Sequence, residues 1–345
     1  MPPERTAVII YTDKRQETTM TMSRSLMRRW AMPAAVVLGL LGGTATASAE
    51  TYPSRRIELI VPWQAGGGAD VVARALSAAA ARHLPQPIVV INKPGATGAV
   101  GLGEVVHAKP DGYKLVLSSS ELTFLNYLGL AKFTYQDLIP VARLNADPAA
   151  VAVRADAPWT TIEQFVADAR KPDANIRVGN AGQGSAWHMA AAALADKTGA
   201  KFNHIPYAGG APATLALLGG HIDAVTVSTA EVFTHVAAGK LKVLAVMADK
   251  RVGGFENVPT LKERNIDLSM GIWRGISAPK GTPPEVIAVL KTAIAKSVQE
   301  PVMRQTLEKL HFSTDTYADD VTLQAAMVKE SAQFKQLASR ISVRE

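Results

Sequence analysis

The chain has 345 residues, of which 48% are hydrophobic and 19% are charged, a composition typical of soluble proteins and a length sufficient for two domains. It contains no cysteine, which excludes disulfides, thiolate metal sites and cysteine catalysis. The net charge of +7 is spread without basic runs and only 6% of the residues are aromatic, so we expect no nucleic-acid partner.

The N-terminal segment has the three parts of a secretory signal peptide. Arg28 and Arg29 precede an apolar run over residues 31–43, and Ala47-Ser48-Ala49 follows as an A-x-A cleavage site. The run is shorter than the about 20 residues that span a bilayer. A buried helix is the alternative, but it would leave both arginines against a core. We therefore expect cleavage near Ala49, a periplasmic location and a mature net charge of +4.

The first 21 residues are polar and patternless. Met22 is a better start for the signal peptide, so we interpret residues 1–21 as a mis-called extension.

Strand-like and helix-like segments alternate downstream of residue 50. We expect strands over 56–62, 87–92, 113–119, 176–180, 224–228 and 241–247, and a segment over 151–159 that leads into a helix over 161–171. Further helices are expected over 70–84 and 98–108, from Pro283-Pro284, and near Asp319-Asp320. This alternation predicts an α/β protein whose parallel sheets are covered by helices.

Two glycine-rich loops, "VPWQAGGGAD" (61–70) and "GNAGQGSAWH" (179–188), each follow a strand and open a helix. Ligands of α/β sheets bind beyond the carboxyl ends of strands, where helix N-termini hold anions and glycine lets the backbone come close. Asp70 and Ser185 are the expected N-caps. A single such loop would favour a plain strand-to-helix turn. Two such loops in separate halves of the chain favour an anion-binding site between them, and we call them the first jaw (61–70) and the second jaw (179–188) of this site.

Neither loop carries a nucleotide-binding or nucleophile motif. The first lacks the Lys-Ser/Thr of a P-loop, and Trp187 stands where G-x-S-x-G needs glycine. Ser185 and His188 are explained by a cap and a first-turn histidine, with catalysis as the alternative. The seven histidines have no metal-binding spacing, so we expect no metal and no cofactor.

Many segments together carry a family resemblance. They include "YPSRRIELIVPWQAGGGADVVAR", "NKPGATGAVG", "KPDGYKLVLSS", "GNAGQGSAWHMA", "HIPYAGGAPATLALLGGHID" and "WRGISAPKGTPPEVI". In this order they make the chain resemble the solute-binding proteins of tripartite tricarboxylate transporters, the Bug receptor family, over nearly the whole mature chain. The resemblance implies an α/β two-domain periplasmic binding protein fold, type II-like, with two interdomain crossings and a central ligand cleft. Domain 1 would comprise 50–152 plus 272–345, and domain 2 would comprise 153–271.

The resemblance also implies a ligand carboxylate held mainly by backbone N–H groups. Carried over to this sequence, the binding residues are Trp63, Ala65, Gly66, Gly67 and Asp70 in the first jaw, Gly184, Ser185 and Ala186 in the second, and Ser119, Ser120, Tyr207 and Ser228 beside them. Trp63 replaces the more common Phe, and Ala69 replaces a hydroxyl residue that would be a donor. Whether Trp63 and Trp187 line the pocket or pack in the core stays open.

The implied function is a periplasmic receptor, not an enzyme. It would capture a small organic carboxylate between two lobes and deliver it, as a monomer, to the permease subunits of a membrane transporter. A hydrolase or lyase using Ser185 or His188 is one alternative, and the ligand-binding partner of a two-component sensor is another. Amino acids, di- and tricarboxylates and aromatic acids all remain open as ligands.

Overall fold

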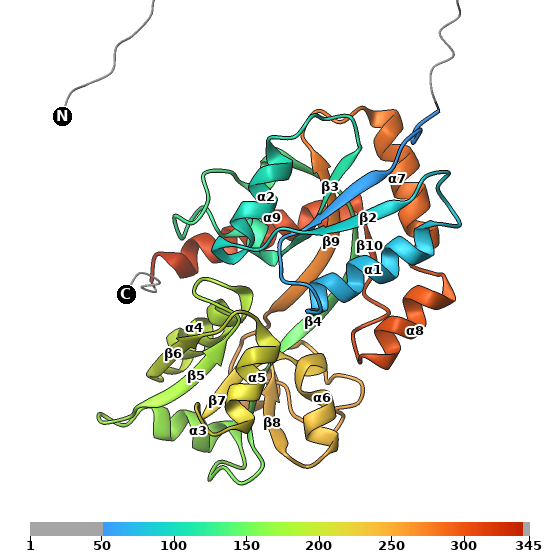
Figure 1. The fold of residues 1–345 in the computed structure, drawn as a ribbon. Coiled ribbons are helices and arrows are strands. Elements are labelled where there is room, and N and C mark those ends of the chain that lie inside the picture. Colours follow the sequence, from blue (N-terminus) through green and yellow to red (C-terminus); the bar gives the residue numbers. More distant parts are fainter. Residues whose placement is uncertain (1–50, 341–345) are drawn as a thin grey trace, which may run out of the picture. The chain divides into compact units, whose positions relative to one another are not determined.

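The computed structural model describes residues 51–340, so the predicted signal peptide lies outside the described residues. The described chain forms two groups of strands, each covered by helices (Figure 1). This confirms the predicted α/β class and the arrangement in two halves.

The first strand group contains the N-terminal elements and most of the C-terminal ones. Its strands are β1 (Ile57–Val61), β2 (Ile88–Asn92), β3 (Lys114–Ser119), β9 (Gly271–Pro279) and β10 (Ala318–Asp319). Its helices are α1 (Gly68–Ala80), α2 (Ala99–Val106), α7 (Pro284–Ser297), α8 (Pro301–Lys309) and α9 (Asp320–Ala338), with short 3-10 turns η1 (Ala96–Gly98) and η2 (Ser120–Thr123). The helix starts predicted at Pro283-Pro284 and Asp319-Asp320 are confirmed.

The second strand group is built from the middle of the chain. Its strands are β5 (Ile176–Asn180), β6 (Phe202–Pro206), β7 (Ala224–Ser228) and β8 (Leu241–Val246). Its helices are α3 (Ile162–Ala169), α4 (Ala186–Thr198), α5 (Gly210–Leu218) and α6 (Thr229–Ala237). Strands β5, β6 and β7 pair in parallel, as β1, β2 and β3 do in the first group.

The long strand β4 (Leu138–Arg154) joins the two groups (Figure 1). Residues 138–148 pair with β9, and residues 149–154 pair with β7 and β8. All of these pairings are antiparallel, as is the pairing of β3 with β9, so the expectation of purely parallel sheets is wrong for the joining strands. The physical reason is that β4 and β9 run directly from one group to the other, without the helical crossover that makes neighbouring strands parallel.

Each strand group has its own apolar core. Ile57, Leu76 and Leu117 are buried in the first, and Phe165 and Val225 in the second. Burying each such side chain contributes about 1.5–3 kcal/mol relative to leaving it in water. These cores hold the strand ends, and therefore the loops that follow them, in fixed positions.

Candidate functional site

The first glycine loop runs from the end of β1 into α1. The N-cap of α1 is Gly67, so the expectation that Asp70 caps this helix is wrong: Asp70 is its third residue. Its Oδ2 instead accepts the N–H of Gly66 at 2.9 Å and the Nε–H of Arg74 at 2.9 Å, and its Oδ1 accepts Nδ2–H of Asn92 at 2.9 Å. Gly66 has φ +82°, a conformation that favours glycine. Asp70 therefore shapes the loop from inside the helix.

The first turn of α1 keeps its N–H groups unpaired. The main-chain N–H groups of Gly68, Ala69 and Asp70 donate to no group within residues 51–340, and no side chain caps the helix. Ala69 and Asp70 are buried. Since buried N–H groups without an acceptor are unfavourable, this turn is a candidate anion site.

The second glycine loop runs from β5 into α4, and here the predicted cap is confirmed. The Oγ of Ser185 accepts the N–H of His188 at 3.2 Å, and the N–H of Gly184 donates to Nδ1 of His188 at 2.9 Å. Burial, together with the neighbouring His204, lowers the pKa of His188 to about 4, so its ring is a neutral acceptor at neutral pH. The two side chains are therefore both engaged with the backbone, and the hydroxyl does not donate to the imidazole as a nucleophile does to its base.

A buried glutamate meets the N-terminus of α4. The N–H of Ala186 donates to Oε1 of Glu121 at 3.1 Å, and the Oγ–H of Ser119 donates to its Oε2 at 2.6 Å. Burial raises the pKa of Glu121, and the hydrogen bonds from Ser119 and Ala186 and the charge of Arg274 oppose the rise. Two of the residues predicted to bind the ligand, Ser119 and Ala186, thus lie together around a carboxyl group of the protein itself.

The site also contains a buried arginine. Arg274 on β9 is 3% exposed, and its Nη1 donates to Oδ2 of Asp147 at 2.6 Å. Its Nη2 lies 3.2 Å from the position that a Cβ on Gly68 would occupy, and its guanidinium lies 5.0 Å from the ring centroid of Phe312. Its Nε is buried without a partner. The guanidinium is therefore packed against the first residue of α1.

The N-terminus of α6 carries another acidic group. Ser228 caps α6, and its N–H and Oγ–H both donate to Oε2 of Glu231 at 3.1 Å. The Glu231 carboxyl group fills the space beside Gly210, the first residue of α5. Burial raises the pKa of Glu231, with the charge of Arg274 opposing the rise. Both Glu121 and Glu231 are therefore close enough to Arg274 for its charge to act on them.

The segment after β2 bridges the two glycine loops. The Oγ–H of Thr97, in the loop after β2, donates to the main-chain oxygen of Gln183 at 2.8 Å. Gly98 lies next to Thr97 and contacts the indole of Trp63, where a Cβ would lie 3.4 Å from the ring. Trp63 is therefore held beside the first loop, and the two predicted jaws meet through Thr97.

The other predicted residues occupy different surroundings. Ala65 is exposed on the first loop, and Tyr207 lies half-buried after β6, against Gly179. The Oγ of Ser120 accepts the N–H of Trp273 at 3.2 Å, so its hydroxyl is engaged with the joining strand β9. Trp187 is 4% exposed within the core of the second strand group. That position places Trp187 in the core.

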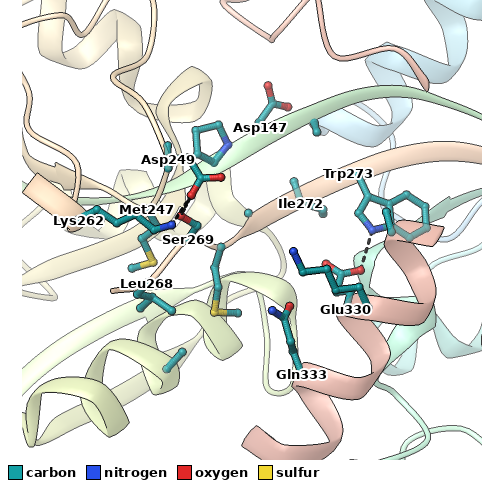
Figure 2. Close-up of a pocket in the computed structure, with 18 of the residues that line it drawn as sticks. Asp147, Met247, Asp249, Lys262, Leu268, Ser269, Ile272, Trp273, Glu330 and Gln333 are labelled. Atoms are coloured by element: carbon teal, nitrogen blue, oxygen red, sulfur yellow. Dashed lines mark hydrogen bonds and ion pairs between the residues drawn. The ribbon is translucent and has the colours of Figure 1, made fainter. Parts of the chain in front are cut away.

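A large groove lies along α9, α4 and the joining strands (Figure 2). Its volume is about 940 Å³, and Asp147, Met247, Asp249, Lys262, Ser269, Glu330 and Gln333 are among its lining residues. Asp249 accepts hydrogen bonds from both Lys262 and Ser269 at 2.6 Å. None of the residues predicted from the sequence lines this groove. Asp249, Lys262 and Ser269 thus pair with one another, whereas the first turn of α1 leaves donors free at residues that the sequence predicted, so the junction of the two loops is the stronger candidate site.

Within residues 51–340, no three His, Asp or Glu side chains gather in a way that could hold a metal ion. In the same range, no helix has the length and apolar character needed to cross a bilayer.

Comparison with known proteins gives a consistent result. The profile described as tripartite tricarboxylate transporter family receptor matches residues 72–342. The chain is similar to the protein BugT of Bordetella pertussis, with 32% identity over 269 residues that cover 76% of this chain and 82% of BugT.

Two solved structures are similar as well. One is the crystal structure of a TctC solute binding protein from Polaromonas without ligand, at 55% identity and a TM-score of 0.71, covering 84% of this chain and all of that one. The other is MatC from Rhodopseudomonas palustris with bound malate, at 27% identity and a TM-score of 0.76, covering 83% of this chain and 100% of that one.

Proposed function

The chain belongs to the tripartite tricarboxylate transporter receptor family, and from this premise we propose that it captures one small organic carboxylate in the periplasm and delivers it to the permease subunits of a membrane transporter. The proposal is carried by the first turn of α1, at the carboxyl end of β1, where the N–H groups of the half-buried Gly68 and the buried Ala69 and Asp70 lack acceptors within residues 51–340. A helix N-terminus at this position suits a carboxylate. The similar protein MatC has malate bound.

The two lobes proposed here follow the predicted domains, residues 50–152 with 272–345 as domain 1 and residues 153–271 as domain 2. Contacts between them include the bonds from Thr97 to Gln183 and from Ala186 to Glu121. A ligand held by both lobes stabilises the closed arrangement, because it makes its full set of contacts only there. Closure would then be the signal that the permease recognises.

The proposed receptor is exported and acts as a monomer. N-terminal sequencing of the periplasmic protein should begin at or near Glu50, after removal of the signal peptide. A protein that keeps Met22 and stays in the cytoplasm would contradict this location.

The first experiment is a thermal-shift screen of a few dozen carboxylates, followed by calorimetry. The screen spans amino acids, hydroxy acids, dicarboxylates, tricarboxylates and aromatic acids. A ligand present at 100 times its Kd should stabilise the protein by about 2.7 kcal/mol. If the folded protein binds no member of the panel, the proposed function is wrong.

No observation favours the alternative of a hydrolase or lyase at Ser185 or His188, since both side chains are engaged with the backbone. Incubating the identified ligand with excess protein and following it by mass spectrometry tests this alternative. Turnover that disappears in Ser185→Ala would support an enzyme. The sensor alternative shares the fold and the ligand, and a pull-down of solubilised membrane proteins by the liganded receptor distinguishes a permease partner from a sensor kinase.

A further inference from the structure

The two helix N-termini at the junction of the loops are not equivalent. In α4, the first helical N–H, that of Ala186, donates to Glu121, and the third, that of His188, donates to Ser185. In α1, the corresponding N–H groups of Gly68, Ala69 and Asp70 have no acceptor within the described chain. An anionic ligand group therefore meets free donors at α1 but a resident carboxylate at α4.

Arg274 adds a cation to the free N-terminus. Its Nη1 is used by Asp147, but its Nη2 and Nε make no hydrogen bond within residues 51–340. The Nη2 is packed against Gly68, where a Cβ would lie 3.2 Å away. A guanidinium offers five N–H donors in a planar fork that suits a carboxylate. The free donors of Arg274 and of α1 thus lie side by side.

The strand register keeps these groups together. Arg274 on β9 is paired with Ser119 on β3, and Ser119 donates to Glu121. The sheet therefore places Arg274 beside Ser119, and Ser119 holds the carboxyl group of Glu121, which follows in the turn η2. Their spacing should be retained when the ligand binds.

We infer that the ligand carries a single carboxylate, which binds between the first turn of α1 and the guanidinium of Arg274. The N-terminus of α4, where a second ligand carboxylate would bind, is occupied by Glu121. The inference rests on the proposed function and specifies its ligand class. The group at the other end of the ligand is uncharged or cationic.

The charges around Arg274 support this class. Asp147 already pairs with the guanidinium, and Glu121 and Glu231 are two further acidic groups within reach of its charge. A dicarboxylate would bring a second anion into a poorly solvated site where Glu121 already accepts the first N–H of α4 and Asp147 already pairs with Arg274, so this anion would lack partners. A hydroxyl or ammonium group could instead donate to the same acids.

The test uses matched ligands that differ only in the group at the far end. The first set compares adipate, a dicarboxylate, with three monocarboxylates of the same chain length: hexanoate and its ω-hydroxy and ω-amino derivatives. A shorter set compares butyrate with succinate, and an aromatic set compares benzoate with terephthalate. Affinities are measured by calorimetry at neutral pH. In the set that binds best, we expect a monocarboxylate member to bind about tenfold more tightly than the dicarboxylate.

Variants then assign the roles of the two residues. Arg274→Lys keeps a charge beside Asp147 but loses the fork, and should weaken the preferred monocarboxylate about tenfold or more. Glu121→Gln should improve dicarboxylate binding relative to monocarboxylate binding by about tenfold, because a neutral amide is displaced from the N-terminus of α4 more readily than a carboxyl group. The matched controls Arg55→Gln and Glu163→Gln change exposed residues and should leave the affinities unchanged.

Should Arg274→Lys fail to fold, the double variant Arg274→Met with Asp147→Asn removes both charges at once and avoids an unpaired buried carboxylate. It is expected to fold and to lose monocarboxylate binding. A wild-type preference for the dicarboxylate, or unaltered monocarboxylate affinity in the Arg274 variants, would overturn the inference while leaving a carboxylate receptor in place. Binding of none of these acids would instead count against the proposed function itself.

Discussion

The indole Nε1–H of Trp273 donates to Oε2 of Glu330 at 2.7 Å, and this bond ties the middle of α9 to the joining strand β9 (Figure 2). Thr123 donates to the same oxygen at 3.1 Å. Burial raises the pKa of Glu330 to about 7, and the charge of Glu121 adds to this rise. The hydrogen bonds from Trp273, Thr123 and Ser120 act in the opposite direction and lower the pKa. Glu330 is thus an acidic group whose titration should change stability near neutral pH.

Between pH 4.5, the ordinary pKa of a glutamate, and about 7, the folded protein holds a proton on Glu330 that the unfolded chain has released. Unfolding then releases this proton, so the free energy of unfolding must fall as pH rises through this range and stay level above it. The shift corresponds to up to about 3 kcal/mol. We expect Glu330→Gln, which can still accept from Trp273, to remove this loss.

Urea unfolding of wild type and Glu330→Gln across this pH range measures the effect. The variant should become the more stable protein above pH 7. Glu308→Gln, at an exposed position of α8, serves as the control and should follow the wild type. Parallel pH profiles of wild type and Glu330→Gln would show that Glu330 is not responsible.

A second prediction uses two adjacent glycines of the first loop. Gly67 has φ −78°, and a Cβ there would meet only the main-chain oxygen of Gln64 at 3.5 Å. Gly67→Val should therefore fold normally and block ligand approach to α1. Gly66 has φ +82°, so Gly66→Val should instead lower stability by about 1–2 kcal/mol.

Thermal unfolding and calorimetric titration with the identified ligand separate the two outcomes. Full affinity in a normally folded Gly67→Val protein would mean that the ligand does not approach this loop. A strongly destabilised Gly67→Val protein would show that the position is needed for the fold alone.

Much of the site's framework could be predicted from the sequence. Glycine loops that follow apolar runs gave the positions of both helix N-termini, and Ser185 was predicted correctly as a cap because serine favours that position. Asp70 was predicted wrongly, because an acidic residue in the third helical position fits the same pattern and only the fold shows which residue turns the chain. The joining strand β4 was recognised only at its end, since Pro140 and Pro148 interrupt its pattern.

The groups that distinguish the two helix N-termini could not be predicted. Glu121 lies 65 residues from Ala186 in the chain, and Arg274 lies 127 residues from Asp147. Strand register brings them together, and a single sequence does not specify which distant strands become neighbours. The one available signal was a lone arginine within the otherwise uncharged segment "GIWRGISAP" (271–279), where a buried charge needs a partner.

A third prediction concerns the contact between the proposed lobes. Thr97→Val keeps the shape of the side chain but loses the bond to the main-chain oxygen of Gln183. We expect a larger fraction of open protein without ligand, and a ligand affinity reduced about fivefold, the effect of about 1 kcal/mol. Small-angle scattering with and without ligand measures the change in compactness. Thr97→Ser keeps the hydroxyl and should resemble the wild type; equal scattering for Thr97→Val and wild type would remove Thr97 from the closing mechanism.

The last prediction concerns Ser185, whose Oγ accepts the N–H of His188 at 3.2 Å. Ser185→Ala leaves this buried N–H unpaired and should lower the free energy of unfolding by about 1 kcal/mol, whereas Ser185→Asp restores an acceptor and should recover stability. The two variants are expected to differ in ligand affinity. The aspartate adds an acidic group near Glu121 and should lower the affinity for every carboxylate. The alanine removes a hydroxyl donor, and a hydrogen bond from this hydroxyl to the ligand would make its loss cost about 1–2 kcal/mol of binding free energy. Denaturant unfolding and calorimetry on the same preparations distinguish these effects. If Ser185→Ala unfolds like the wild type, the cap contributes nothing to stability; if its affinity is also unchanged, Ser185 does not contact the ligand.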